Sequence, residues 1–581
     1  MSLDRSEPVP PRISEPDPDA TLPFPEPASA DPAGTPADAP APPAAHSSTA
    51  ASAMIAVGIL LSRVAGLIRT RVVAMFFGTS EFADVFAAGM RMPNLLQNLL
   101  GEGVLSASFI PVYSELLHQG RKKEAGRVAG AIFSLLFAAA GALALVGIVL
   151  APVIVTVFMP GLDAQRYELT VAVTRIVFPM AGILVLSAWA LGILNSHRNF
   201  FLPYFAPVLW NAAMIATLLA FGRGMQPAEL VIALAWGALA GGLLQFAVQL
   251  PRVLRLEREL KLGWGWRIEG VREAVRNAGP AVVGRGVVQI SGYLDYFLAS
   301  FLAAGALATL QFAQLFYMLP ISLFGMSVAA AELPELSRQR ESGAEVLRDR
   351  ASAGLERIAF YVVPSFVAFA LLGDVVVATL LQTGRFTRED TLIVYFTLFA
   401  FSLGLLATTA SRMFSSTFFA LRDTRTPARY AIIRVVLSAT LGVLLMIQFE
   451  AIDVDRLGLY IPGGIFSDIR IGGRQLGVVG LALGTGIAAW VEWALLKRAL
   501  RQRIGSVGAG AGPLTRMFGA ALAGAAAGWV VRMLLPDGMI HIISGTIILG
   551  TFGLVYFGVA GALGLSQSGA LLRRIRGRFG R

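Results

Sequence analysis

Residues 62–111 read SRVAGLIRTRVVAMFFGTSEFADVFAAGMRMPNLLQNLLGEGVLSASFIP, and this stretch decides what kind of protein the chain is. It joins two apolar runs, at about 53–77 and 83–117, and each run is long enough at 1.5 Å per residue to cross about 30 Å of hydrocarbon. Charged residues interrupt both runs, although a charge at the centre of a membrane helix costs roughly 2.5–3.5 kcal/mol. The stretch therefore predicts membrane helices whose charged residues have a function.

The composition of the whole chain agrees with a membrane protein. Of 581 residues, 55% are hydrophobic and only 15% are charged, whereas about a quarter of a soluble chain is charged. The absence of cysteine excludes disulfides, thiolate metal sites and thiol nucleophiles. The four histidines are scattered, which argues against a metal or histidine-based catalytic site. Arginines that flank membrane helices account for the net charge of +11, so this charge does not indicate a nucleic-acid partner.

Apolar stretches recur along the chain, and we count about fourteen between residues 51 and 565. The expected fold class is an all-α polytopic membrane protein. Lysine and arginine concentrate in alternate loops, at 121–127, 252–276, 338–350, 422–429 and 497–503, and in the last residues, 573–581. Because such residues stay on the cytoplasmic side, the pattern predicts that both chain ends lie in the cytoplasm.

The chain divides into five expected parts. Residues 1–50 are rich in Pro and Ala and predict a disordered cytoplasmic tail. Two lobes of six helices follow at 51–260 and 270–500, then two additional helices at 513–565 and a basic cytoplasmic tail at 566–581. Residues 194–207 (LNSHRNFFLPYFAP) and 420–429 (ALRDTRTPAR) share one pattern, which predicts parallel repeats around a central cavity. The alternative is that loop arginines and small residues recur in any polytopic protein.

The charges inside the first two spans are the candidate binding residues. An arginine keeps its charge in a low dielectric and binds phosphate oxygens with two parallel hydrogen bonds. The arginines in these spans therefore indicate an anionic cargo, with phosphate or diphosphate favoured. Snorkelling of Arg69 and Arg71, or a structural pair between Arg63 and Glu102, is the alternative. The cluster comprises Arg63, Arg69, Arg71, Asp84, Arg91 and Glu102.

Charged residues in later spans and helix-breaking residues extend this set. Arg285, Asp295, Arg412 and Arg434 are expected to add charge from the second half. Proline removes a backbone donor and is tolerated in a membrane helix where the freed groups face a cavity or another helix. Hinges are therefore expected at four positions, although membrane helices carry more proline and glycine in general. These positions are Pro93, Gly279, Pro280 and Pro320.

The order of these motifs resembles the MviN/MurJ family, the proposed flippases of the peptidoglycan precursor lipid II. The resemblance begins in residues 62–111 and continues at 193–211 (ILNSHRNFFLPYFAPVLWN), 382–387 (QTGRFT) and 420–427 (ALRDTRTP). It implies fourteen helices of the multidrug/oligosaccharidyl-lipid/polysaccharide exporter type, with two lobes around an arginine-lined cavity. Charged positions of the family pattern fall on Arg63, Arg69, Asp84, Arg91 and Glu102, and a basic one falls on Arg412.

The chain departs from a familiar bacterial form of this family at two cavity positions. Gln97 stands where that form has arginine, and Gln314 with Leu315 replaces an Asp-Arg pair. Two cavity cations are thus missing. Arg71, Arg285 and Asp295 are the candidates to compensate.

As the resemblance implies, the expected function is translocation of lipid II, a polyprenyl diphosphate-linked disaccharide peptide, from the cytoplasmic to the outer leaflet of the bacterial plasma membrane. The expected mechanism is alternating access, and the purpose is cell-wall synthesis. The rivals are an exporter of another polyprenyl-linked glycan and a non-transporting scaffold that binds cell-wall synthesis proteins. A drug exporter should favour carboxylates, and a lipid diphosphate enzyme needs a metal or acid/base group. We expect no cofactor. A coupling ion or the membrane potential is a candidate driving force, with Asp84, Glu102 and Asp295 as candidate coupling groups.

Overall fold

The computed structural model describes residues 46–339, 343–454, 458–536, 538–565 and 567–568. From Ala51 onward the chain forms one compact unit. Most of the two predicted tails lies outside the described residues. The helix that opens the unit begins at His46, so the last five residues of the predicted N-terminal tail are helical.

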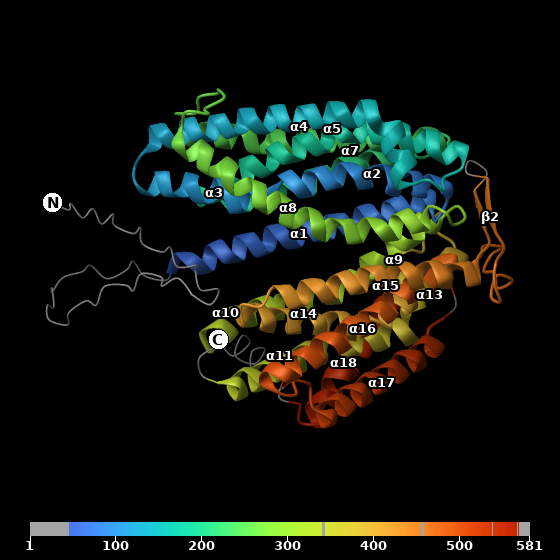
Figure 1. Cartoon of the computed structure of the whole chain (residues 1–581). Helices are drawn as coiled ribbons and strands as arrows, with labels where there is room; N and C mark the ends of the chain where they lie inside the picture. Colours follow the sequence, from blue (N-terminus) through green and yellow to red (C-terminus); the bar gives the residue numbers. More distant parts are fainter. Residues whose placement is uncertain (1–45, 340–342, 455–457, 537, 566, 569–581) are drawn as a thin grey trace, which may run out of the picture. The chain divides into compact units, whose positions relative to one another are not determined.

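Nearly all the described secondary structure is helical (Figure 1). The helices are α1 (His46–Phe77), α2 (Glu81–Leu100), α3 (Glu102–His118), α4 (Lys122–Phe158), α5 (Ala164–Ser196), α6 (Phe201–Phe221), α7 (Pro227–Leu256), α8 (Glu269–Ala299), α9 (Ala306–Pro320), η1 (Ile321–Met326), α10 (Ser327–Arg338), α11 (Ala344–Leu371), α12 (Gly373–Leu381), α13 (Arg388–Ser402), α14 (Leu405–Ala420), α15 (Arg425–Phe449), α16 (Gly477–Ile504), α17 (Ala511–Leu534) and α18 (His541–Ala562). Two short antiparallel strands, β1 (Ile452–Val454) and β2 (Leu459–Ile461), pair between α15 and α16.

The predicted fold class is confirmed, but the count of fourteen spans is not. Ten described helices are long and apolar enough to cross a membrane, or up to eleven if α13 and α14, bent by 41°, form one span. The helix α1 contains three arginines, and α2 and α3 divide one expected span between them. A helix that turns charged side chains to water loses the uniform apolarity by which spans are recognised.

The predicted helix breaks differ from the observed ones. The helix α2 continues through Pro93 and ends only at Leu100, before Gly101. Gly279 and Pro280 lie inside α8 rather than at its start, because the preceding turns also form helix and bury Val271 against the first lobe. Pro320 does end α9, and a π-helical segment follows it. Such segments mark local irregularity and are frequent at functional sites.

The two turns that predicted an internal repeat have the same backbone geometry. Among the described non-glycine residues, only Arg198 and Arg422 have positive φ, at 56° and 60°. In each turn this residue's N–H donates three residues back, at 3.0 and 2.9 Å. The next N–H donates five residues back, at 2.8 and 2.9 Å. A non-glycine residue in the left-handed region is uncommon, so its recurrence at matching positions supports the repeat.

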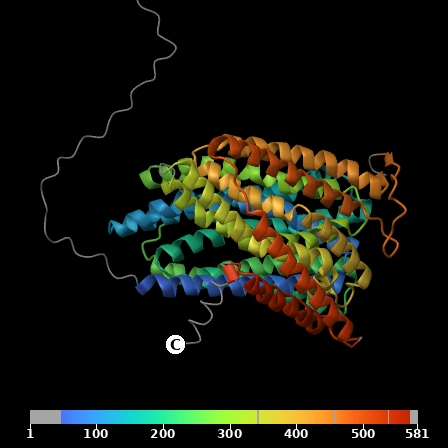
Figure 2. The same ribbon diagram turned by 90° about the horizontal axis from the view of Figure 1, so that it is seen from below.

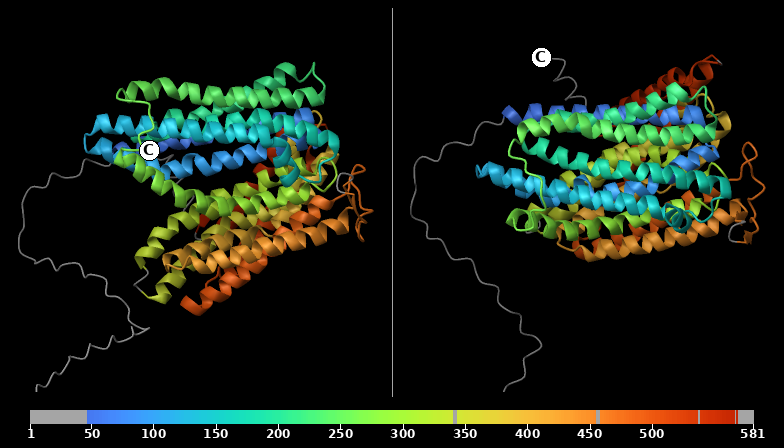
Figure 3. Two further views of the ribbon diagram at one scale, coloured as in Figure 1. Left: turned by 45° about the horizontal axis from the view of Figure 1, so that its top comes forward. Right: turned by 90° about the horizontal axis from the view of Figure 1, so that it is seen from above.

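The helices pack side by side into two groups, and Figures 2 and 3 show them nearly parallel from below and from above. In the first group α5 contacts α2, α4 and α7, and in the second α16 contacts α13, α14 and α15. The pair α17 and α18 packs on α11 and α12. The helix α8 contacts α3 of the first group and α15 of the second. It therefore joins the two lobes.

Close backbone approach between α15 and α16 yields a stability prediction. A Cβ added to Gly484 would lie 2.5 Å from the backbone nitrogen of Gly442, because small residues let membrane helices approach closely. We expect Gly484→Leu to destabilise the protein by about 1–3 kcal/mol, as overpacking does. The measurement is the thermal unfolding midpoint of the purified protein in detergent. Gly550→Leu is the matched control, because a Cβ there meets nothing within 4 Å. Equal midpoints for the two variants would contradict the assignment.

Candidate functional site

A cavity of about 350 Å³ lies between α1 and α2 of the first lobe and α8, α9 and η1. Three of the predicted arginines, Arg63, Arg69 and Arg91, line it together. Gln311, Gln314 and Ser322 add neutral polar groups. The structure thus brings together three charges that are spread over 28 positions of the sequence. The two lobes form the walls of one chamber.

None of these three arginines forms a salt bridge in the described part of the chain. The guanidinium carbon of Arg69 lies 5.1 Å from the ring centre of Trp210. That of Arg91 lies 4.1 Å from the ring centre of Tyr296, and its Nη2 donates to the carbonyl of Gly292 at 2.7 Å. Aromatic faces favour a cation without neutralising it. The cavity therefore keeps a net positive charge.

Arg63 and Arg91 also retain unused hydrogen-bond donors. The Arg91 Nε is buried and has no hydrogen-bond partner in the described structure. The Arg63 side chain is exposed into the cavity, and no partner for it occurs among the described residues. A buried donor without a partner costs about 1–3 kcal/mol. An anionic ligand in the cavity would satisfy these donors.

The second lobe contributes fewer free charges to this cavity than the sequence suggested. Gln314 and Leu315, the two departures from the family pattern, line it directly. Asp295 accepts a hydrogen bond from Gln314 Nε2 at 3.5 Å. Arg434 is paired with the buried Glu492 at 3.0 Å. Arg412 is exposed on α14 and does not line the cavity. The side chains of Arg285 and Glu102 lie outside the described part of the structure.

Arg71 and Asp84 lie away from the cavity, contrary to what was expected of them. Arg71 donates through Nη1 to the carbonyls of Thr379 and Leu380, at 3.1 and 2.6 Å. These carbonyls belong to the last turn of α12, where a helix lacks internal donors and favours a cation. Arg71 therefore links the two lobes and is not available as a compensating charge in the cavity.

Asp84 is fully buried and caps a helix of the other lobe. Its carboxylate accepts from the backbone N–H of Gly305 at 2.6 Å and of Ala308 at 2.8 Å, where α9 begins. It also pairs with Arg166 at 3.4 Å. A carboxylate at a helix N-terminus satisfies free donors and complements the helix dipole. Gly305 has a φ of 94°, and a Cβ there would lie 2.1 Å from the carbonyl oxygen of Thr79, so the two lobes meet backbone to backbone.

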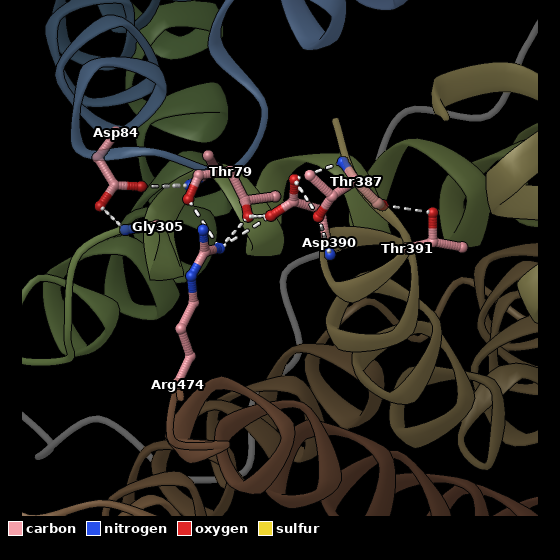
Figure 4. A network of polar contacts seen from close by, with 8 residues as sticks. Thr79, Asp84, Gly305, Thr387, Asp390, Thr391 and Arg474 are labelled. Carbon is pink, nitrogen blue, oxygen red and sulfur yellow. Dashed lines mark hydrogen bonds and ion pairs between the residues drawn. The ribbon is translucent and has the colours of Figure 1, made fainter. Parts of the chain in front are cut away.

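Beside this cap, a polar network joins three distant segments (Figure 4). Arg474, in the loop that carries β1 and β2, donates to the Thr79 hydroxyl and carbonyl and to Asp390 Oδ1, the last at 3.0 Å. The Thr79 hydroxyl donates in turn to Asp390. The other Asp390 oxygen caps α13 through the N–H of Thr387 at 2.8 Å. We call this network and the Asp84 cap the hairpin-end closure, formed by Thr79, Asp84, Gly305, Asp390 and Arg474.

Sequence reasoning did not find the hairpin-end closure. Thr79 and Asp390 are 311 positions apart, and Thr79 and Arg474 are 395 apart. Thr79 lies in the short connection between α1 and α2, Arg474 lies in the long connection 450–476 between α15 and α16, and no sequence pattern links the two. The one available signal was that these connections belong to loops with few basic residues. The closure therefore lies at the end of the molecule opposite the arginine-rich loops.

Comparisons with known proteins agree with one another. The family model described as "Lipid II flippase MurJ" matches residues 73–454. The chain is 32% identical over 393 residues to a probable lipid II flippase MurJ of Haemophilus influenzae, covering 65% of this chain and 77% of that protein. It is 30% identical over 451 residues to a lipid II flippase MurJ of Burkholderia cenocepacia, covering 76% and 82%.

Solved structures show the same fold. The structure titled "Lipid II flippase MurJ, inward closed conformation" superposes with a TM-score of 0.68 at 22% identity, covering 87% of this chain and 98% of that one. An inward-facing multidrug resistance transporter of the MATE family superposes with a TM-score of 0.59 at 16% identity, covering 78% and 98%. At these identities the likeness establishes the two-lobed transporter fold and no more.

Proposed function

The chain belongs to the lipid II flippase MurJ family, and from this premise we propose that it moves lipid II from the cytoplasmic to the outer leaflet of the plasma membrane for cell-wall synthesis. The chain is a multi-pass membrane protein of a transporter family. In this proposal it acts as a transporter and not as an enzyme, so that the cargo leaves chemically unchanged. Both chain ends lie in the cytoplasm, as the arginine-rich loops favour.

One observation carries the proposal: three arginines without acidic partners line a single cavity between the lobes. Unpaired charges in a low-dielectric setting are expensive to keep. The diphosphate of lipid II offers oxygens that a guanidinium binds with two parallel, charge-assisted hydrogen bonds. The cavity thus suits the anionic part of the cargo, while the polyprenyl tail stays in the bilayer.

The contacts between the lobes support an alternating-access mechanism. In this proposal the hairpin-end closure holds the lobes together on the side with few basic residues, and cargo enters from the cytoplasmic side. Cargo can drive reorientation only by binding the closing state more strongly than the open one. The hinges of this proposal are Pro320 with the adjoining π-helix and the break at Gly101.

The driving force is also part of the proposal. An elementary charge moved across 100 mV is worth about 2.3 kcal/mol. Because the cavity is positively charged and its cargo negatively charged, the membrane potential acts on the loaded and empty protein differently. We propose that this difference biases the cycle toward export.

The test of the proposed function is rescue of bacterial cells depleted of their own lipid II flippase. The wild-type chain is expected to restore growth and to restore the amount of labelled lipid II exposed on the outer face. A chain with Arg63, Arg69 and Arg91 all replaced by alanine is expected to restore neither at equal abundance. Rescue of growth by both chains, without recovery of exposed lipid II, would overturn the proposal in favour of a scaffold role.

A further inference from the structure

A second cavity, of about 470 Å³, lies within the first lobe between α2, α3, α5, α6 and α7. Its polar side chains are neutral amides and hydroxyls, and none of the described residues that line it is charged. We call it the amide cavity; its polar side chains are Gln97, Asn98, Ser106, Ser187 and Gln245. Its chemistry therefore differs from that of the arginine cavity.

Several polar groups of the amide cavity have no hydrogen-bond partner among the described residues. The side chains of Gln97, Asn98 and Ser106 make no hydrogen bond in the described structure. Gln245 is oriented, because its Nε2 donates to the Ser187 hydroxyl at 3.1 Å, which leaves its Oε1 free to accept. The buried Gln249 donates to the same hydroxyl at 2.7 Å and holds it in place. The cavity thus presents free donors and acceptors on a fixed frame.

These groups match the chemistry of a carbohydrate. An amide offers both a donor and an acceptor, and a hydroxyl does the same, so neighbouring amides can bind neighbouring sugar hydroxyls in pairs. A phosphate or carboxylate offers only acceptors and would be better served by a cation. A purely apolar ligand would leave the amides without partners, which costs about 1–3 kcal/mol per group. A neutral, hydroxyl-rich ligand fits best.

The two cavities lie in series along one helix. Arg91 lines the arginine cavity and Gln97 lines the amide cavity, and both belong to α2. Six residues of α-helix correspond to about 9 Å along the axis. Since α2 starts beside the hairpin-end closure, Gln97 lies farther along α2 from that closure than Arg91 does. A cargo with a diphosphate joined directly to a sugar can place one part in each cavity.

We propose that the amide cavity binds a neutral sugar ring of the cargo headgroup while the arginine cavity holds its phosphates. The inference rests on the proposed function, which supplies a disaccharide linked to a diphosphate. It adds that recognition is divided between two cavities. The glutamines select for the sugar, and the arginines hold any polyprenyl diphosphate.

The experiment measures binding of three probes to the purified protein in lipid nanodiscs. The probes are a polyprenyl diphosphate, the same lipid carrying the disaccharide, and the free disaccharide. The variant is Gln97→Leu combined with Gln245→Leu. We expect it to weaken binding of the sugar-bearing lipid about tenfold and to leave binding of the bare lipid unchanged. Gln311→Leu, in the arginine cavity, is the matched control and should affect the two lipids equally.

The outcomes separate this inference from the proposed function. If the double variant weakens both lipids equally while its unfolding midpoint stays that of wild type, the amide cavity does not recognise sugar. If it weakens neither lipid, the inference is also wrong. If wild type binds neither lipid but binds the free disaccharide through Gln97 and Gln245, the proposed function fails and the sugar site stands.

Discussion

Replacing Arg69 and Arg91 by alanine is expected to lower the rate of lipid II translocation by at least a hundredfold. Both guanidinium groups line the cavity between the lobes, and neither forms a salt bridge in the described structure. A hydrogen bond to a charged group is worth about 1.5–3 kcal/mol, so loss of each arginine should cost roughly a factor of ten to a hundred. The measurement is the outward transfer of labelled lipid II in cells that depend on the variant.

Lysine substitutions separate charge from geometry at these two positions. A lysine keeps the charge but cannot engage a phosphate with two parallel bonds. Arg69→Lys and Arg91→Lys should therefore retain intermediate activity. Arg175→Ala is the matched control, because Arg175 is exposed on α5 and lines neither of the two cavities. If the alanine variants transport as well as this control, the cavity is not the route of the cargo.

The sequence predicted the charged cavity better than the positions of its members. Apolar runs interrupted by charges mark helices that face water on one side. Three arginines of such runs line one cavity, as this pattern indicates: Arg63, Arg69 and Arg91. Asp84 and Arg71 occur in the same runs but point to the other lobe. Helical periodicity gives the direction of a side chain around its own helix. It does not predict which other helix or cavity the side chain contacts on that side.

The helix boundaries show a similar limit. Pro93 and Pro280 were expected to break or open helices, and both lie within continuous ones. One missing backbone donor can be tolerated when neighbouring helices hold the backbone in place. The break falls instead at Gly101, whose extended backbone no sequence period specifies. The repeat was predictable, because the turns at Arg198 and Arg422 are local structures set by neighbouring residues.

Removing Arg474 is expected to open the outward side of the molecule. Its guanidinium bridges Thr79 of the first lobe and Asp390 of the second, at the hairpin-end closure. Removing a charged group with such bonds costs about 1.5–3 kcal/mol, and 1.4 kcal/mol changes an equilibrium tenfold. Arg474→Ala should thus raise the outward-open population about tenfold or more, and Asp84→Asn should do the same by weakening the cap on α9.

The native chain contains no cysteine, so a single reporter measures this opening cleanly. Met318 lines the arginine cavity and is 52% exposed, and Met318→Cys places a thiol there. In the parent chain a membrane-impermeant maleimide should label it slowly from outside and quickly from the cytoplasmic side. Arg474→Ala should speed the outside reaction about tenfold.

Arg470→Ala is the control for the loop itself, because Arg470 is exposed on the same segment and has no partner among the described residues. It should leave the outside labelling rate unchanged. If Arg474→Ala also leaves that rate unchanged, the closure does not hold the lobes together. If both variants speed labelling equally, the loop covers the cavity as a whole and the Arg474 bonds are incidental. If only Arg474→Ala raises the rate of labelling from outside, outward access depends on the Arg474 contacts, because Arg470→Ala removes an arginine from the same loop without removing a bond between the lobes.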